Sequence, residues 1–186
     1  LKDYNTNANY RRWNYRLNVD MDITKTTLLK VGVSGSLDKK NEPGLASNVW
    51  ASLMGYNPIA TPVMYSNGYV PTFDGGDGRT NPWVVATQTG YQETWNNRLQ
   101  TNITLEQNFD FITKGLKFVG RYGMDTENYQ WINRKKIPEM WKAERNRDSD
   151  GQLVMKKMRD EVLMGQESKA QGKRKEYFEV ELHYNR

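Results

Sequence analysis

The sequence predicts an all-β fold, an antiparallel transmembrane β-barrel segment whose long extracellular loops carry short helices. Three observations lead to this fold class: five segments of alternating polarity, connections that are alternately short and long, and an aromatic-rich but polar composition. The 186 residues have a mean hydropathy of −0.89 and include 6 Trp and 11 Tyr. Disordered chains are poor in aromatic residues. This composition therefore suits strands that have two wet boundaries and an aromatic girdle.

The first segment, residues 10–23, shows the alternation most clearly. Every second residue from Trp13 to Ile23 is apolar or aromatic, and the residues between them are polar or charged. Such a period of two is typical of strands with unlike faces. The same pattern recurs near 28–37, 94–108, 116–129 and 175–185. The first and third segments alternate over twelve or more residues, which fits a tilted membrane strand of about 9–11 residues better than a soluble strand of about 5–6.

The polar face of these segments is too charged for a dry core. Burying an unpaired charge away from water is costly, whereas a charge that faces a water-filled lumen stays hydrated. The charged residues that we expect to face such a lumen are Arg12, Arg16, Arg98, Arg121, Glu179 and Glu181. A large soluble sandwich or solenoid, with its charged face in solvent, explains the alternation equally well. It explains the strand length and the connections less well.

The connections are short around 24–26 and 110–115 and long at 38–92 and 130–172. Outer-membrane barrels show this alternation of short periplasmic turns and longer extracellular loops. In the first long loop, the helical spacing of residues 45–53, with Gly55 after it, predicts a short helix. The second long loop is highly charged, with a turn expected at 148–151 and helix around 153–164.

Two groups of aromatic residues are candidates for specific contacts. Those of the first long loop could stack on a ligand, contact a partner protein, or pack the loop on itself; they are Trp50, Tyr56, Tyr65, Tyr69, Phe73 and Trp83. The others lie near segment ends, where a membrane-interface girdle is expected; they are Trp13, Tyr15, Trp95, Tyr122, Tyr129, Trp131 and Tyr184.

The sequence indicates no catalytic, cofactor or metal site, and we do not expect an enzyme. It has no Cys and only one His, His183, so that neither a His-based triad nor a multi-His metal site can be built from it. The Asp- and Gly-rich stretches at 74–81 and 148–152 match a calcium loop only in part. The net charge of +5 arises from interleaved basic and acidic residues, which does not favour nucleic-acid binding.

Four stretches in order carry a resemblance to a known family: "YRRWNYRLNVDMDITKTTLLKVGVSGSLDKKNEPG", "ASLMGYNPIATPVMYSNG", "NPW" and "NRLQTNITLEQNFDFITKGLKFVGRYGMD". Together they resemble the barrel of the SusC/RagA-like TonB-dependent outer-membrane transporters of Bacteroidetes. The resemblance implies that residues 1–186 are part of a barrel of about 22 strands, within a longer chain whose plug domain is not in this segment.

The same resemblance implies a function and partners. We expect nutrient uptake across the cell outer membrane, with import of glycans or peptides in cooperation with a SusD-like surface lipoprotein and with TonB, which acts through the missing amino-terminal part. The strands would be surrounded by lipid and lipopolysaccharide, and no nucleic acid would be bound. Two alternatives stay open: a passive porin-like barrel, and a soluble β-rich carbohydrate-binding protein.

Overall fold

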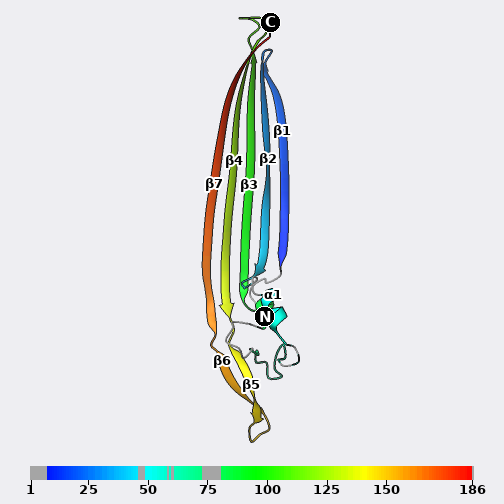
Figure 1. Ribbon diagram of the computed structural model, residues 1–186, viewed down its shortest axis with the longest axis vertical. Helices are drawn as coiled ribbons and strands as arrows, with labels where there is room; N and C mark the ends of the chain where they lie inside the picture. The colour runs from blue at the N-terminus through cyan, green and yellow to red at the C-terminus, as the bar shows by residue number, and fades with distance from the viewer. Residues whose placement is uncertain (1–7, 46–48, 58, 60, 73–80, 186) are drawn as a thin grey trace. The chain divides into compact units, whose positions relative to one another are not determined.

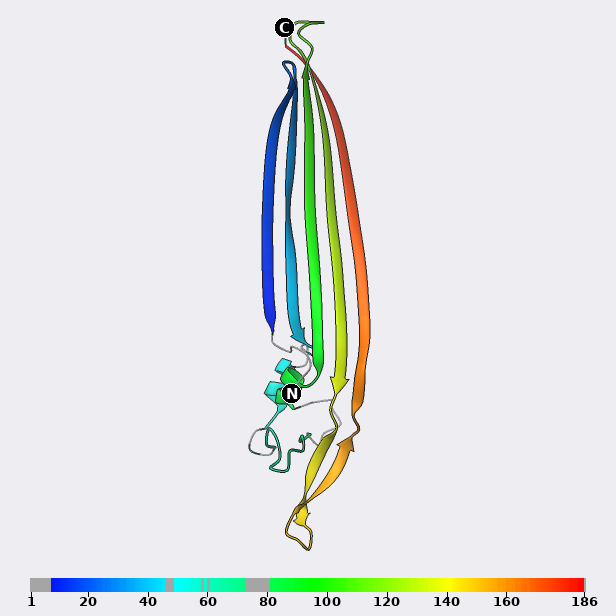
Figure 2. The ribbon, with the colours of Figure 1, turned by 180° about the vertical axis from the view of Figure 1, so that it is seen from behind.

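The computed structural model describes residues 8–45, 49–57, 59, 61–72 and 81–185. These residues form mostly antiparallel β-structure, as the alternation predicts. Five long strands lie side by side in the order β1-β2-β3-β4-β7 (Figure 1), and Figure 2 shows the same order from behind. Their bounds are β1 Asn9–Thr24, β2 Thr27–Pro43, β3 Gly90–Asn108, β4 Leu116–Ile137 and β7 Val162–Tyr184. Among the described residues the sheet is open, with β1 and β7 at its edges.

The remaining elements lie in the long connections. Strands β5 (Met140–Arg147) and β6 (Leu153–Arg159) form a separate antiparallel pair, and the helices are α1 (Val49–Gly55) and α2 (Pro82–Thr87). In the part of the chain that the structure describes, no helix has the length and apolar character needed to cross a membrane.

Backbone hydrogen bonds fix the register of the sheet at both ends of its strands. Between β2 and β3, the amide of Asn108 donates to Thr26 O and the amide of Gly44 donates to Gly90 O, and both pairs of residue numbers sum to 134. Between β3 and β4, the pairs 109/116 and 89/136 both sum to 225. The register is therefore the same at the two ends of each pair. At the β4–β7 junction the amide of Asn185 donates to Gly115 O, a sum of 300.

The turn between β3 and β4 owes its shape to Asp110 and Gly115. The Asp110 carboxylate accepts hydrogen bonds from the Gly115 amide at 2.7 Å and from the side chain of Asn108 at 2.7 Å. Both contacts stabilise the ionised form and lower the pKa of Asp110, the Gly115 contact being the larger cause. Gly115 has φ of +84°, and a Cβ there would collide with the carbonyl of Asn185. Glycine is therefore required at this position.

The chain divides into two compact units. We call the unit made of Tyr10–Lys39, Thr94–Gln130 and Ala170–Arg186 the strand unit. The other, which includes Lys40–Glu93 and Trp131–Lys169, is the loop unit. The small apolar core of the loop unit contains Val70, Val84 and Met140, against which Trp83 and Ile137 pack.

Two details of the long connections differ from the sequence-based expectation. Residues 153–164 are not helical: β6 and the start of β7 occupy them, because β6 pairs with β5 and this pairing overrides the weak helical pattern. Helix α2 was not expected. Its start has a clear local cause, since the Asn81 side chain accepts a hydrogen bond from the Trp83 amide at 3.0 Å and Pro82 follows as the first helical residue.

Candidate functional site: the charged face of the sheet

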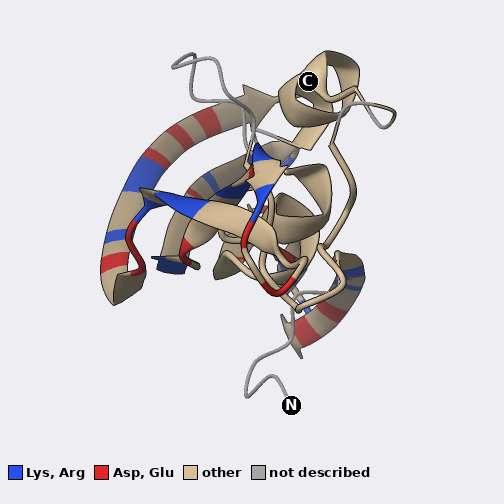
Figure 3. Ribbon diagram, turned by 90° about the horizontal axis from the view of Figure 1, so that it is seen from below, with Lys and Arg blue, Asp and Glu red and all other residues tan. Residues whose placement is uncertain are grey.

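One face of the sheet in the strand unit carries charged residues from all five strands. Ion pairs join neighbouring strands, among them Arg12 with Asp38, Arg98 with Glu127, and Arg121 with Glu179 and Glu181. Figure 3 shows basic and acidic stretches following one another along the strands, rather than one basic or acidic block. The six residues that the sequence suggests as lumen-facing share this face, five of them through these pairs and Arg16 through its parity with Arg12 in β1.

Towards the turns, this face holds two clusters of side chains. Glu106 accepts from Lys30 at 2.7 Å and from Lys117 at 2.6 Å, so that one carboxylate joins three strands. In the second cluster, His183 Nε2 lies 2.8 Å from Glu181, which also contacts Arg121. These networks pair charges that are only partly exposed.

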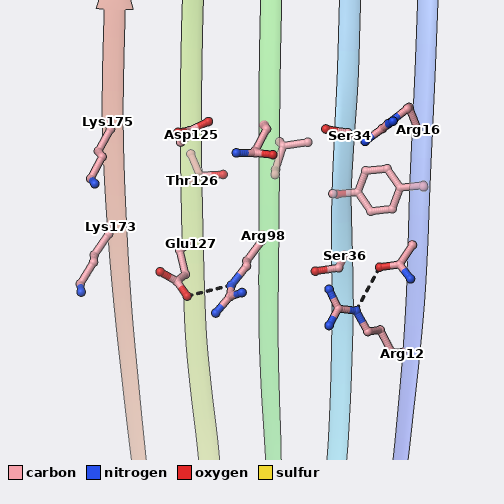
Figure 4. A pocket seen from close by; sticks show the side chains of 15 residues that line it. Arg12, Arg16, Ser34, Ser36, Arg98, Asp125, Thr126, Glu127, Lys173 and Lys175 are labelled. Carbon is pink, nitrogen blue, oxygen red and sulfur yellow. Dashed lines mark hydrogen bonds and ion pairs between the residues drawn. The ribbon is translucent and has the colours of Figure 1, made fainter.

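Further along the strands, the same face is hollowed into a groove of about 740 Å³. Figure 4 shows its side chains, which come from every strand of the sheet. Residues at each end of the groove are basic, with short polar side chains such as Ser34 and Ser36 between them. The charged residues that line it are Arg12, Arg16, Arg98, Asp125, Glu127, Lys173 and Lys175.

The opposite face of the strand unit is an apolar band. Tyr15 lies across Gly35, where an added Cβ would collide with the tyrosine ring and with the carbonyl of Arg98. The register extends this pairing into rows, each with one residue per strand. One row is apolar in all five strands: Val19, Val31, Ile103, Tyr122 and Phe178. Leu17 and Phe178 are 59% and 73% exposed, so none of the described residues covers the band there.

The upper limit of this band, on the side away from the short turns, moves stepwise across the sheet. In the row of Leu17, β7 contributes Glu176, and in the row of Tyr15, β4 and β7 contribute Thr126 and Arg174. The row of Trp13 is polar or Gly in three strands, at Asn97, Asn128 and Gly172. The lower limit moves in the same direction by 2 residues, since β7 contributes Leu182 to the row of Ile23 and stays apolar to Tyr184. The band therefore runs obliquely to the strands.

The slope of the upper limit gives a tilt angle. In β7 the continuous apolar run of this face ends at Phe178, in the row of Val19, whereas β1 stays apolar to Trp13, a shift of 19 − 13 = 6 residues. At about 3.3 Å per residue this is roughly 20 Å along the strand, over four strand spacings of about 4.8 Å, or roughly 19 Å. The upper limit of the band is thus inclined by about 45° to the perpendicular of the strands, near the tilt of membrane β-strands, and the lower limit is inclined less.

The register also corrects part of the expected aromatic girdle. Trp13, Tyr15 and Trp95 lie at the polar limit of the apolar face, and Lys39 Nζ sits 5.4 Å from the centroid of the Trp95 ring. Tyr129 and Trp131 do not belong to this group. Both have the parity of Glu127 in β4, opposite to that of Tyr122, and their position near a segment end does not show this distinction.

The aromatic candidates of the loop unit do not form one stacking surface. Trp50 is exposed, with 76% of its surface accessible, whereas Trp83 packs against the core. Tyr56 donates to Pro62 O at 3.1 Å, and its burial, followed by the nearby Tyr65, raises its pKa to about 12. The remaining members are Tyr65, whose hydroxyl accepts from the Ala143 amide, Tyr69, which stacks on Trp141, and Phe73, which lies outside the described residues.

Sequence reasoning missed Trp141, which organises this part of the loop unit. Tyr69 stacks on it with ring centroids 4.6 Å apart, and Lys157 Nζ lies 5.7 Å from its ring centroid. Lys157 also pairs with Glu139, which accepts from the Trp141 indole at 3.2 Å. Lys157 is the larger cause of the lowered pKa of Glu139, and Glu139 in turn raises the pKa of Lys157. Because Lys157 and Glu139 are paired with each other, we interpret this arrangement as a contact that stabilises the loop unit.

The described residues contain no cluster of three or more metal-ligating side chains. In the expected turn at 148–151, the Asp148 carboxylate accepts from the amides of Asp150 and Gln152. This carboxylate is thus engaged by the backbone. Of the other Asp- and Gly-rich stretch, all but Asn81 lies outside the described residues.

Comparison with known proteins gives no assignment: no protein-family model matches the chain, and no curated protein matches it. The functional conclusion therefore depends on the geometry of the two faces.

Proposed function

We propose that this chain forms part of the wall of a transporter of the SusC/RagA-like TonB-dependent class in the outer membrane, which imports glycans or peptides. The oblique apolar band is the observation that carries this proposal. An apolar face with oblique limits, the upper one inclined at about 45°, is what a tilted strand needs when a flat hydrocarbon layer crosses it. A soluble sandwich has no such requirement, because its second layer follows the strands of the first.

The charged face supports the same conclusion. Its ion pairs and groove need water on that side of the sheet, because dry burial of so many charges would be strongly unfavourable. In the proposed transporter, this face borders the hydrated interior of the barrel. The unpaired edges β1 and β7 join neighbouring strands of the same wall, which satisfies their backbone groups in the membrane.

The exposed apolar residues of the loop unit support a protein partner. Trp50, Met54 and Ile59 have 76%, 88% and 96% of their surface exposed, and Leu53, Val63 and Met64 are also exposed. Side chains of this kind are stabilised when a partner covers them. In the proposed assembly, the partner is the SusD-like surface lipoprotein.

Cysteine labelling tests directly whether these strands form the wall of a barrel, because residues 1–186 contain no natural Cys. Single variants Leu17→Cys and Val19→Cys are compared with Asn18→Cys in the natural full-length protein, with any Cys outside this segment replaced. In outer-membrane vesicles, a water-soluble maleimide should label position 18 and leave positions 17 and 19 unmodified. After denaturation all three should react. Equal labelling of the three positions in the folded protein would refute the lipid-facing assignment.

A further inference from the structure

The groove on the charged face has an excess of positive charge. Five of its lining residues are basic and two are acidic, which gives a net charge of 5 − 2 = +3. Its volume of about 740 Å³ is in the range of small-molecule binding sites. The two acidic residues, Asp125 and Glu127, are both on β4, so the basic residues on either side of them lack a matching number of carboxylates.

The basic side chains keep most of their donors available. Arg12 uses Nε to contact Asn14 and to pair with Asp38 at 3.5 Å, and Arg98 uses Nε to contact Glu127 (Figure 4). Arg16, Lys173 and Lys175 have no hydrogen-bond or ion-pair partner within the described ranges. These three side chains come from the two edge strands of the sheet, β1 and β7, so that unpaired positive charge flanks the groove on both sides.

We propose that this groove binds carboxylate groups of the imported molecule, and that the transporter prefers acidic oligomers. This inference rests on the proposed function. Guanidinium groups match a carboxylate with two parallel hydrogen bonds, and lysine adds a mobile point charge. Ser34 and Ser36, on β2 beside Arg16 and Arg12, have side chains short enough to leave room for a ligand, and their hydroxyls can hydrogen-bond its uncharged groups.

The test compares acidic and neutral probes on the natural full-length protein purified in detergent. Trigalacturonate and triglutamate carry the carboxylates on a sugar and on a peptide, respectively, and maltotriose and triglycine are their neutral counterparts. The triple variant Arg16→Gln/Lys173→Gln/Lys175→Gln brings the charge of the lining from +3 to 0. It breaks no ion pair among the described residues, and we therefore expect it to fold.

We expect calorimetry to show tighter binding of at least one acidic probe than of its neutral counterpart, and a loss of at least about tenfold in that affinity in the triple variant. The difference in affinity between trigalacturonate and triglutamate shows whether the groove prefers carboxylates on a sugar or on a peptide. The control variant Lys25→Gln/Lys114→Gln removes charges in the two short turns and should leave the affinity unchanged.

Equal affinity of the wild type for acidic and neutral probes would overturn the proposal. A triple variant that keeps the affinity for the acidic probe would also overturn it, because the three basic side chains would then not hold the carboxylate. If its unfolding temperature changed as well, these side chains would contact another part of the chain. The cysteine labelling described above is independent of these results. If labelling alternates but binding ignores charge, the wall assignment stands and only the preference for acidic molecules fails.

Discussion

Replacement of Leu17 by Arg tests how deeply β1 lies in the membrane. The apolar positions of β1 run from Trp13 to Ile23, a span of 23 − 13 = 10 residues. At about 3.3 Å per residue this is roughly 33 Å of strand, and a tilt of about 45° reduces it to a height of roughly 23 Å, close to the apolar band of about 25 Å in outer-membrane barrels. Leu17 lies four residues from one limit and six from the other, near the middle of the layer.

An Arg at the midplane of such a barrel costs about 2–4 kcal/mol, and near an interface about 0–1 kcal/mol. We therefore expect Leu17→Arg to lower the free energy of unfolding by about 2–4 kcal/mol, Ile23→Arg by at most about 1 kcal/mol, and Asn18→Arg, on the hydrated face, by little. Urea unfolding of the full-length protein in vesicles, followed by Trp fluorescence, measures all three.

The gradient between positions 17 and 23 is the decisive quantity. If both apolar-face variants lose the same free energy, the band does not follow membrane depth. If Asn18→Arg loses as much as Leu17→Arg, the two faces are not in different environments. Either outcome would contradict the assignment of one face to lipid and the other to water.

Two further predictions concern backbone geometry and pH. Gly35→Ala should lower the free energy of unfolding by about 1–3 kcal/mol, because the new Cβ meets the Tyr15 ring and a backbone carbonyl. The control Gly165→Ala, whose new Cβ meets nothing within 4 Å, should change it by less than about 0.5 kcal/mol. Equal effects of the two variants in urea unfolding would exclude the close approach at Gly35 as the cause. Asp110→Asn should be less stable than wild type at pH 7, since the folded-state pKa of Asp110 lies below its ordinary value of 3.8. A carboxylate with a lowered folded-state pKa stabilises the fold at pH values above its ordinary pKa, and this stabilisation is lost as the pH falls through the folded-state pKa. The difference in free energy of unfolding between wild type and Asp110→Asn, measured at pH 7 and in steps below pH 4, should therefore shrink as the pH falls. A difference that stays constant would show that the charge of Asp110 is not responsible.

The alternation along the chain was enough to predict where the strands lie, because each strand has two chemically different faces. It did not predict where the longest strands end. Residues 166–176 of β7 have small or polar side chains, among them Ser168, Ala170 and Gly172, on the face that would have to be apolar for the pattern to continue. This segment is extended because it pairs with β4, a contact made across a long separation in sequence. Periodicity cannot detect such a strand, since no period-two pattern marks it.

The charged face was similarly predictable only in part. Parity within a strand identifies Arg98 and Arg121 as residues of the polar face. The neighbours of these arginines can be predicted only when the register between strands is known, since Glu127 is 29 residues from Arg98 and Lys173 belongs to another strand. Composition shows the cluster at 173–175, but only parity in β7 separates Lys173 and Lys175, which line the groove, from Arg174, which pairs with Glu176 on the other face.

The two faces of the strand unit constrain each other through this register. The rows that contain the groove are the same rows in which the opposite face changes from apolar to polar, from Tyr15 in β1 to Arg174 in β7. In β1 the charged groove therefore lies directly behind residues assigned to lipid, separated from them by the thickness of one sheet. Charges in that position avoid a large desolvation cost only if water reaches their side. A sheet with lipid on one face and water on the other meets this condition, whereas a sheet that is dry on both faces does not.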